Sequence, residues 1–425
     1  MALKVRNILL ANQQRFYTIT EDNDLPPNWF TSFFISCELY LDGCSLSTMR
    51  NNVYALKFFL EWLSDNTINL ETRIKSGHSL TSVEISSFIL SAKLANDSDK
   101  KVVDLKPYLS AKKTLNSIHG KKVVGRIVNP ITTNLRISMA VRFVDFLFRH
   151  LHLGIPSQES INNFERVKFE LLDAKPKKSH AASMGRVYNG FNSAIPSNIY
   201  RQLLEIISPE HPKNPFGHAT AKRNQIMIEI LCLTGIRRGA LLKTKLQDLN
   251  LTSHNSILQV TRTPRDKTDP RRHQPAQKTG EHATFLAIEI VRDITQYISN
   301  ERSNYSEAYS HDFLFVTSKD SANTRAGSPL SNSALDEIFK KLSGVLEFRI
   351  HAHLLRHKWN ELFSIKVEKL GLSPDDAEKR RVDAMGWTKG SEMPSRYNQF
   401  IRFQKVHQLQ KLLQEELLQN ATTRD

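Results

Sequence analysis

The chain has 425 residues, and its 59 Lys+Arg exceed its 43 Asp+Glu, which gives a formal charge of +16. The length allows about two or three domains, and a composition that is 40% hydrophobic and 24% charged is typical of globular proteins, so wholesale disorder is excluded. The three cysteines, Cys37, Cys44 and Cys232, show no paired spacing, which excludes a disulfide scaffold and a cysteine-rich structural zinc site.

Targeting signals and long apolar runs are missing from the printed sequence. No run reaches about 18 apolar residues, and no small-residue cleavage site follows the first residues. We therefore expect a cytoplasmic protein without a membrane partner. The positive charge favours a polyanionic partner, nucleic acid first, over a small-molecule substrate, and a merely basic surface is the alternative.

Residues 1–175 are predicted to form a helical domain. Apolar residues recur at three- and four-residue steps in 45–65, with Ser47 as the expected cap, and again in 131–151. Thr81 and Glu84 have the spacing of a capping box. Basic residues that could hold a phosphate backbone, or form a solvated face, lie between the helices. They are Lys100, Lys101, Lys112, Lys113, Lys121, Lys122 and Arg126.

Residues 176–198 are predicted to be a linker, because the stretch around them is rich in Lys, Ser, Gly and Ala and lacks sustained periodicity. The second domain, 199–425, begins with helical patterns. Segments 256–262 and 282–290 are rich in β-branched and apolar residues, and helical patterns resume from Ser331. The fold is therefore expected to be mainly α with a small β-sheet or hairpin.

Two arginines are candidates for stabilising a phosphodiester transition state, whose negative charge is best met by guanidinium groups in place before the reaction. Arg237 follows Thr234-Gly235-Ile236 at the end of an apolar run, where the chain bends, and Arg238 could serve instead. Arg356 lies in the stretch 350–357. The alternative for each arginine is a surface charge near a helix end.

Histidines accompany Arg356. On a helix, His353 and Arg356 share a face, and a histidine beside a cation can accept the proton of an attacking hydroxyl. His353 and His357 also have the spacing of a helical zinc site, but no Glu follows His353 and no third ligand is marked by spacing. We therefore expect no metal and no other cofactor, and a buried structural histidine is the alternative role.

A lysine and a tyrosine complete the set. Lys278 comes just before the turn-like pair Thr279-Gly280 and could donate a proton to a leaving oxygen, with Lys267 as the competing lysine. Tyr397 lies ten residues after Trp387, and neighbouring arginines would activate its hydroxyl as a nucleophile. The alternatives are a solvated hairpin tip for the lysines and a structural aromatic for the tyrosine.

Four motifs in order, TGIRR, QKTGEHATFL, HAHLLRH and MGW followed by Tyr397, resemble the tyrosine recombinase or phage integrase family. The resemblance implies a metal-free transesterification in which Tyr397 attacks DNA and forms a 3′-phosphotyrosine. It assigns Arg237 and Arg356 to the developing charge, Lys278 to the leaving 5′ oxygen and His353 to proton transfer.

Two positions depart from the common family pattern. Trp387 stands where most members have histidine, so its indole can donate a hydrogen bond to the phosphate but cannot shuttle a proton. Ala240 stands where an acidic residue is common.

The same resemblance implies a core-binding-like N-terminal domain, double-stranded DNA as partner and a homo-tetramer on paired DNA sites. Apolar residues Val406, Leu409, Leu413 and Leu417, with Phe403, lie near one face of a C-terminal helix that either docks on a neighbouring subunit or closes the core. A type IB topoisomerase and a degenerate DNA-binding protein on the same scaffold are the competing functions.

Overall fold

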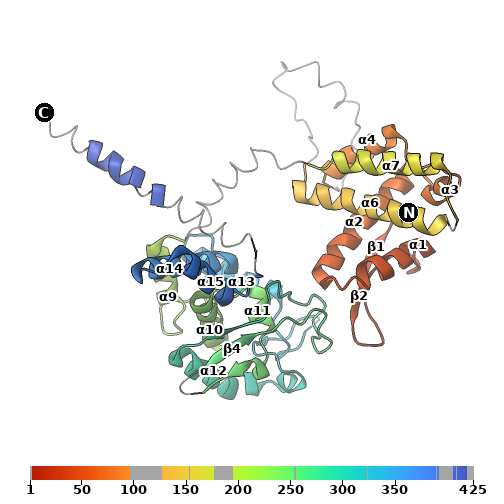
Figure 1. Ribbon diagram of the computed structural model, residues 1–425. Helices are drawn as coiled ribbons and strands as arrows, with labels where there is room; N and C mark the ends of the chain where they lie inside the picture. The colour runs from red at the N-terminus through yellow and green to blue at the C-terminus, as the bar shows by residue number, and fades with distance from the viewer. Residues whose placement is uncertain are drawn as a thin grey trace, which may run out of the picture. The chain divides into compact units, whose positions relative to one another are not determined.

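The computed structural model describes residues 2–95, 127–152, 154–176, 195–252, 255–322, 324–388, 390–391, 405–407 and 409–418 (Figure 1). The chain divides into two compact units. Unit 1 comprises Met1–Leu10 and Arg15–Ser179, and unit 2 comprises Ala11–Gln14 and His180–Asp425. The basic residues between 100 and 126, and most of the expected linker, lie outside the described residues.

Unit 1 opens with a β-hairpin that the helical reading of residues 1–175 missed. Strands β1 (Lys4–Leu9) and β2 (Arg15–Thr20) pair antiparallel, with Lys4 opposite Thr20 and Leu9 opposite Arg15. Tyr17 and Ile19 bury one face of β2, and on the other face Thr20 is buried at the end of the strand. An alternation this short gives a weak period-two signal, and for that reason the sequence pattern did not reveal the hairpin.

The rest of unit 1 is helical. Its helices are α1 (Trp29–Phe34), η1 (Ile35–Tyr40), α2 (Leu46–Asp65), α3 (Leu70–Lys75), α4 (Ser82–Lys93), α6 (Pro130–Leu151) and α7 (Gln158–Asp173). The capping box of Thr81 and Glu84 is confirmed. The predicted cap Ser47 is wrong: the side chain of Ser45 accepts the N–H of Thr48 and caps α2.

Aromatic rings from four helices fill the core of unit 1. The ring centroids of Phe59 and Phe88 lie 5.0 Å apart, and those of Phe34 and Phe143 lie 5.3 Å apart, both in edge-to-face geometry. All four rings are buried. Burying one such side chain contributes about 2–3 kcal/mol, so the packing of α1, α2, α4 and α6 holds this unit together.

Unit 2 is mainly helical with a three-stranded antiparallel sheet, which confirms the expected fold class. The helices before and after the sheet are α9 (Ser197–Ile206), α10 (His218–Thr234), α11 (Arg238–Lys243), η3 (Leu246–Asp248), α12 (Ile288–Asn300), η4 (Arg302–Asn304), η5 (Ser306–Ser310), α13 (Asn332–Val345), α14 (Ala352–Lys369) and α15 (Pro374–Met385).

The sheet has the strand order β3 (Leu249–Asn250), β4 (Ile257–Val260) and β5 (His282–Phe285), with Val260 opposite His282. The apolar stretch 282–290 is a strand only as far as Phe285. Helix α12 begins at Ile288 because buried apolar residues at helical spacing, Ile290, Val291 and Ile294, take over the pattern there.

Buried charges hold the long segment between β4 and β5. The Arg271 guanidinium lies 2.8 Å from the Asp269 carboxylate and also donates to the carbonyl oxygens of Leu242 and Leu330. Lys245 lies 2.8 Å from the Asp266 carboxylate. These contacts tie the segment, which forms no regular structure of its own, to α11, to Lys245 and to the backbone at Leu330.

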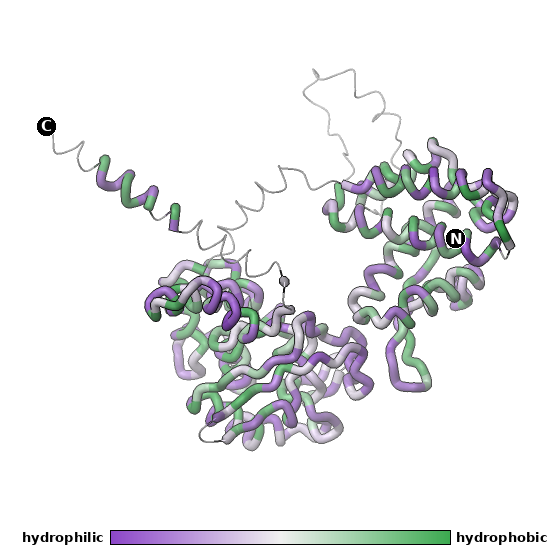
Figure 2. The backbone as a smooth tube through the Cα atoms, in the orientation of Figure 1, coloured by the Kyte–Doolittle hydropathy of each residue, from purple (hydrophilic) through white to green (hydrophobic). Residues whose placement is uncertain are grey.

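The C-terminal segment is helical at 405–407 and 409–418, and its turns alternate between hydrophobic and hydrophilic residues (Figure 2). Val406, Leu409, Leu413 and Leu417 are 50–66% exposed, so the reading of this part as a core helix is wrong. Phe403 lies outside the described residues. Within the described part of the chain, no helix is both long enough and apolar enough to cross a membrane.

Candidate active site

The turn between α10 and α11 places Arg237. Helix α10 ends at Thr234, and Gly235 continues with φ +63°, the left-handed conformation that glycine adopts without strain. A Cβ at Gly235 would lie 2.8 Å from the indole of Trp359, so a larger residue does not fit. Arg237 then takes the N-cap position of α11 and is half-buried.

Arg356 ties this turn to α14. Its side chain lies in the first turns of α14 and is 1% exposed, and its Nη1 donates to the carbonyl oxygen of Gly235 at 2.7 Å. The guanidinium carbon lies 5.6 Å from the centroid of the Trp387 ring, which is a cation–π contact. Arg356 therefore joins the first, third and fourth sequence motifs.

The turn after α15 places Trp387. Helix α15 ends at Met385, and Gly386 has φ +60°. Met385 and Trp387 are buried against Trp359, whose Nε1 donates to the carbonyl oxygen of Leu233 at 2.8 Å. This small apolar cluster fixes the indole of Trp387 beside the buried arginine.

The second motif docks on the same turn. The N–H of Gly280 donates to the carbonyl oxygen of Gly386 at 2.8 Å, and the Nδ1 of His282 lies 3.1 Å from the carbonyl oxygen of Gly280. A Cβ at Gly239 would lie 2.2 Å from the carbonyl oxygen of Ala276, so only glycine lets this segment pass so close to α11. Four stretches distant in sequence thus meet at one place.

Lys278 lies two residues before Gly280, between Gln277 and Thr279, whose buried side chains are hydrogen-bonded at 2.5 Å. Its own side chain is exposed. Lys267 is also exposed, but the residues on either side of it, Asp266 and Thr268, bind Lys245.

The histidines of the third motif are held neutral at pH 7. His353 and His357 lie edge to face with ring centroids 4.5 Å apart. The ring of His353 reaches the surface, yet its partial withdrawal from water, followed by the charges of Arg356, His351 and Arg237, lowers the pKa of His353 to about 4. Burial and then the neighbouring His353 lower the pKa of His357 to about 4. A neutral imidazole can accept a proton.

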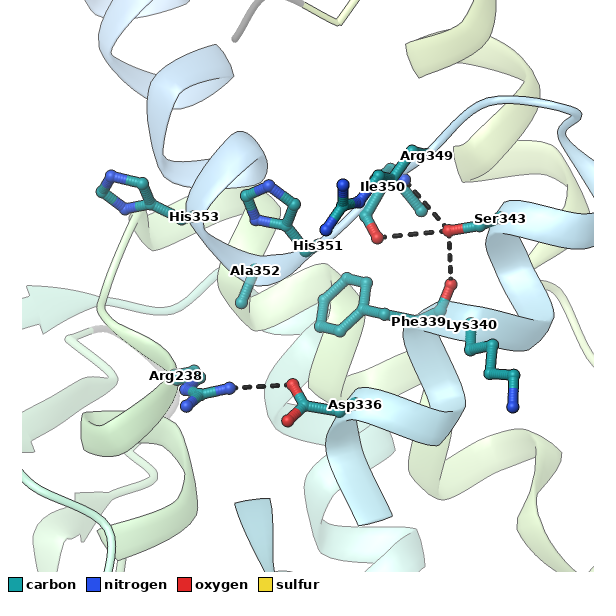
Figure 3. A pocket seen from close by; sticks show the side chains of 10 residues that line it. All are labelled: Arg238, Asp336, Phe339, Lys340, Ser343, Arg349, Ile350, His351, Ala352 and His353. Carbon is teal, nitrogen blue, oxygen red and sulfur yellow. Dashed lines mark hydrogen bonds and ion pairs between the residues drawn. The ribbon is translucent and has the colours of Figure 1, made fainter. Parts of the chain in front are cut away.

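Arg238 takes a different position from Arg237. Its guanidinium lies 2.8 Å from the Asp336 carboxylate, in a pocket of about 540 Å³ (Figure 3). Arg238 and His353 lie on one side of this pocket, and Lys340 and Ser343 lie on the other (Figure 3). After burial, the charge of Arg237 is among the causes that lower the pKa of His282 and His353, whereas Arg238 is among those that lower the pKa of His351.

Three further sequence expectations concern this region. Among the described residues, no three His, Cys, Asp or Glu side chains lie close enough to hold a metal ion together. Tyr397 lies outside the described residues. Ala240 is 6% exposed within the apolar core of unit 2, so no carboxylate stands there.

His282 was not singled out from the sequence, although the structure places it among these residues. Its signal was present in the motif QKTGEHATFL, but a lone histidine in a strand usually indicates a structural role. Only the docking of Gly280 on Gly386 reveals which groups the imidazole approaches.

The ordered set of motifs now has a match among known families. Residues 195–399 match the phage integrase family. Residues 195–399, which are most of unit 2, therefore carry the phage integrase domain. A tyrosine recombinase, XerC of Bacillus pumilus (strain SAFR-032), is 28% identical over 168 residues, which are 38% of this chain. The matched stretch spans 47% of that protein's length.

A solved structure shares the fold of this chain. It is the XerH site-specific recombinase bound to palindromic difH substrate in a post-cleavage complex. The two structures align with a TM-score of 0.50 at 14% sequence identity, over 87% of this chain and 80% of that chain. At this level of identity the likeness concerns the fold.

Proposed function

We propose that the chain is a site-specific DNA recombinase or integrase that cuts and rejoins double-stranded DNA by metal-free transesterification. One observation carries the proposal: the Arg356 side chain binds the Gly235 carbonyl and lies over Trp387, while Gly280 binds Gly386, so all four family motifs surround one place. The match of residues 195–399 to the phage integrase family supports the same reaction.

In the proposed reaction, the hydroxyl of Tyr397 attacks a DNA phosphorus, the bond to the 5′ oxygen breaks, and a 3′-phosphotyrosine forms. Arg237 and Arg356 stabilise the charge on the non-bridging oxygens, and the Trp387 indole donates a hydrogen bond. Neutral His353 accepts the proton of the hydroxyl, and Lys278, near the docked Gly280, protonates the leaving oxygen. The phosphotyrosine keeps the energy of the broken phosphodiester bond, which is then available for rejoining the strand.

The remaining domain assignments belong to this proposal. Residues 1–175 bind DNA as a core-binding-like domain, 176–198 link it to the catalytic domain 199–425, and the excess of 16 positive charges neutralises phosphates in the cytoplasm. The exposed apolar residues of 405–418 dock on a neighbouring subunit, so that a homo-tetramer forms on paired DNA sites.

Covalent trapping tests the reaction. We expect a mobile element or prophage to encode an integrase of this kind. Nicked suicide DNA that carries candidate ends of that element is incubated with the protein and separated by denaturing electrophoresis. We expect a shifted covalent band with the parent chain and with Tyr309→Phe, which changes an exposed tyrosine elsewhere, and no band with Tyr397→Phe. EDTA should leave the band unchanged. A band with Tyr397→Phe would show that another residue is the nucleophile.

Assembly is tested separately. Leu413→Glu with Leu417→Glu should reduce the tetramer on paired sites, measured by sedimentation, and leave binding to a single site unchanged. Gln414→Glu, on the same exposed turns, is the matched control and should assemble normally. Equal assembly of all variants would contradict docking through this segment. Strand exchange between two sites, compared with relaxation of one supercoiled circle, separates a recombinase from a type IB topoisomerase.

A further inference from the structure

His282 is the first residue of β5, and its ring lies against the turn that carries Trp387. Its Nδ1 lies 3.1 Å from the carbonyl oxygen of Gly280, whose N–H in turn donates to Gly386. A Cβ at Gly386 would lie 2.3 Å from the Nδ1 and 2.9 Å from the Cε1 of His282. The backbone of the hairpin and of the turn therefore fixes the imidazole between them.

This arrangement determines which ring nitrogen carries the proton. A carbonyl oxygen only accepts, so Nδ1–H donates to Gly280, and the Nε2 of the neutral ring keeps its lone pair. The Nε2 is buried and has no hydrogen-bond partner among the residues that the structure describes. Buried polar atoms usually have partners, so an orphaned ring nitrogen in a site is a feature that a ligand can complete.

The charges around the ring indicate the sign of that ligand. Burial lowers the pKa of His282, the Gly280 carbonyl opposes this, and the positive charges of Arg356 and Arg237 lower the pKa further. The adjacent Glu281 carboxylate accepts the backbone N–H of Arg262 at 3.2 Å. An anion held by the two arginines would cancel their effect on the ring and favour its protonated form.

We propose that His282 is a further ligand of the reacting phosphate, beside Arg237, Arg356 and Trp387. When the phosphodiester binds beside Arg237 and Arg356, Nε2 takes up a proton from water and donates a hydrogen bond to a non-bridging oxygen, while Nδ1–H keeps its bond to Gly280. His282 thereby supplies the titrating group that the indole of Trp387 lacks. The inference rests on the proposed function, because it takes DNA phosphate as the anion.

Two substitutions of His282 distinguish the roles of its two ring nitrogens. An Asn side chain can replace Nδ1 as the donor to Gly280 but reaches no further, whereas a Gln amide can donate from the position of Nε2. We expect His282→Asn to slow single-turnover formation of the covalent DNA complex by about 10²-fold, as the loss of one transition-state donor does. His282→Gln should stay within about tenfold of the parent chain, and the DNA affinity of both should be unchanged.

A third variant serves as the control for His282→Asn and His282→Gln. His273→Asn, an exposed histidine in the same long segment, should react at the parent rate. Melting temperatures of all variants report whether they fold. If His282→Asn reacts like the parent chain while His282→Gln is impaired, only the bond to Gly280 matters, and the phosphate role is overturned.

A second measurement does not depend on cleavage. Nitrogen NMR of the ¹⁵N-histidine-labelled chain, titrated with inorganic phosphate at pH 7, distinguishes protonated from unprotonated ring nitrogens, and His282→Gln assigns the signal. We expect Nε2 of His282 to become protonated as phosphate binds. The two proposals can fail separately. If the parent chain forms no covalent complex with DNA, the proposed function is refuted. If phosphate leaves the Nε2 signal of His282 unchanged, the ligand role of His282 is refuted whether or not the chain cleaves DNA.

Discussion

In the part of the chain that the structure describes, the buried polar side chains of unit 1 are hydroxyls and one amide, whereas those of unit 2 include nine charged groups. The uncharged set is Thr20, Thr31, Asn52, Thr133 and Ser160, and the charged set is Arg223, Lys243, Asp248, Asp269, Arg271, Arg302, Arg356, Lys358 and Arg381. Arginines of unit 1 also bind backbone carbonyls, as Arg136 does with Ala92 and Leu94, but they are only partly buried. Helices satisfy their own carbonyls, but the irregular segments of unit 2 do not.

In unit 2, buried guanidinium groups donate hydrogen bonds to backbone carbonyl oxygens of the irregular segments. Arg302 donates to the carbonyl oxygens of Phe313, Ala308 and His311, and Arg223 donates to that of Val316. Arg356 makes the same kind of bond to Gly235, yet histidines and Trp387 surround it. Unit 2 therefore combines a structural use of buried arginine with the chemical use proposed for Arg356, and the neighbours of each guanidinium distinguish the two.

The largest expected effect comes from breaking a buried ion pair. Arg271→Met leaves the Asp269 carboxylate, which is 0% exposed, without its countercharge and should reduce the free energy of unfolding of unit 2 by about 3–5 kcal/mol. Arg149→Met breaks the surface pair with Glu38 in unit 1 and should cost less than about 1 kcal/mol. Urea unfolding measures both, and equal losses would contradict the contrast between the units.

Arg356→Lys tests whether the buried Arg356 takes part in the reaction. The lysine keeps a positive charge but loses the planar fork, so covalent complex formation should slow by about 10²–10³-fold while DNA affinity changes little. Arg238→Lys, at the exposed pair with Asp336, is the matched control and should react within about twofold of the parent chain, because a surface ion pair contributes little. Similar rates for the two variants would argue against a role for Arg356 in the transition state.

Gly386→Ala probes the docking of the hairpin. The new Cβ would meet His282 and the Gly280 carbonyl at 2.3 and 2.7 Å, in addition to the strain of a positive φ. Gly371→Ala has a similar φ but open space around it, so it isolates the backbone strain of about 1–2 kcal/mol. We expect Gly386→Ala to be destabilised by about 1–3 kcal/mol more than Gly371→Ala in thermal unfolding. Equal losses of stability in the two variants would mean that the hairpin moves away from the new Cβ at little cost.

The last expected effect is a difference in acid sensitivity between the two units. The unfolded chain protonates His357 near the ordinary value of 6.5, whereas the folded unit 2 does so only near 4. Between these pH values the unfolded form binds more protons, so the stability of unit 2 falls as the pH falls from 6.5 to 4. His357→Gln should reduce this slope.

Unit 1 should respond at lower pH. Burial alone would raise the pKa of Glu84, but hydrogen bonds from Arg73 and Thr81 bring it below the ordinary 4.5, so this contribution is lost only as the pH falls below that value. Fluorescence of Trp29 and Trp62 reports unit 1, and that of Trp359 and Trp387 reports unit 2. If His357→Gln leaves the pH dependence of the stability of unit 2 unchanged, other titrating groups cause that dependence.

The sequence by itself determined the helical pattern, the capping box at Thr81, the small sheet and the four motifs, because these depend on residues close together in the chain. It could not place Arg238 against Asp336, reveal the short hairpin of β1 and β2, or find His282. Those outcomes depend on contacts over long sequence distances, such as Arg356 with Gly235 and Gly280 with Gly386. Local periodicity specifies which face of a helix is apolar, but only tertiary packing decides which side chains meet.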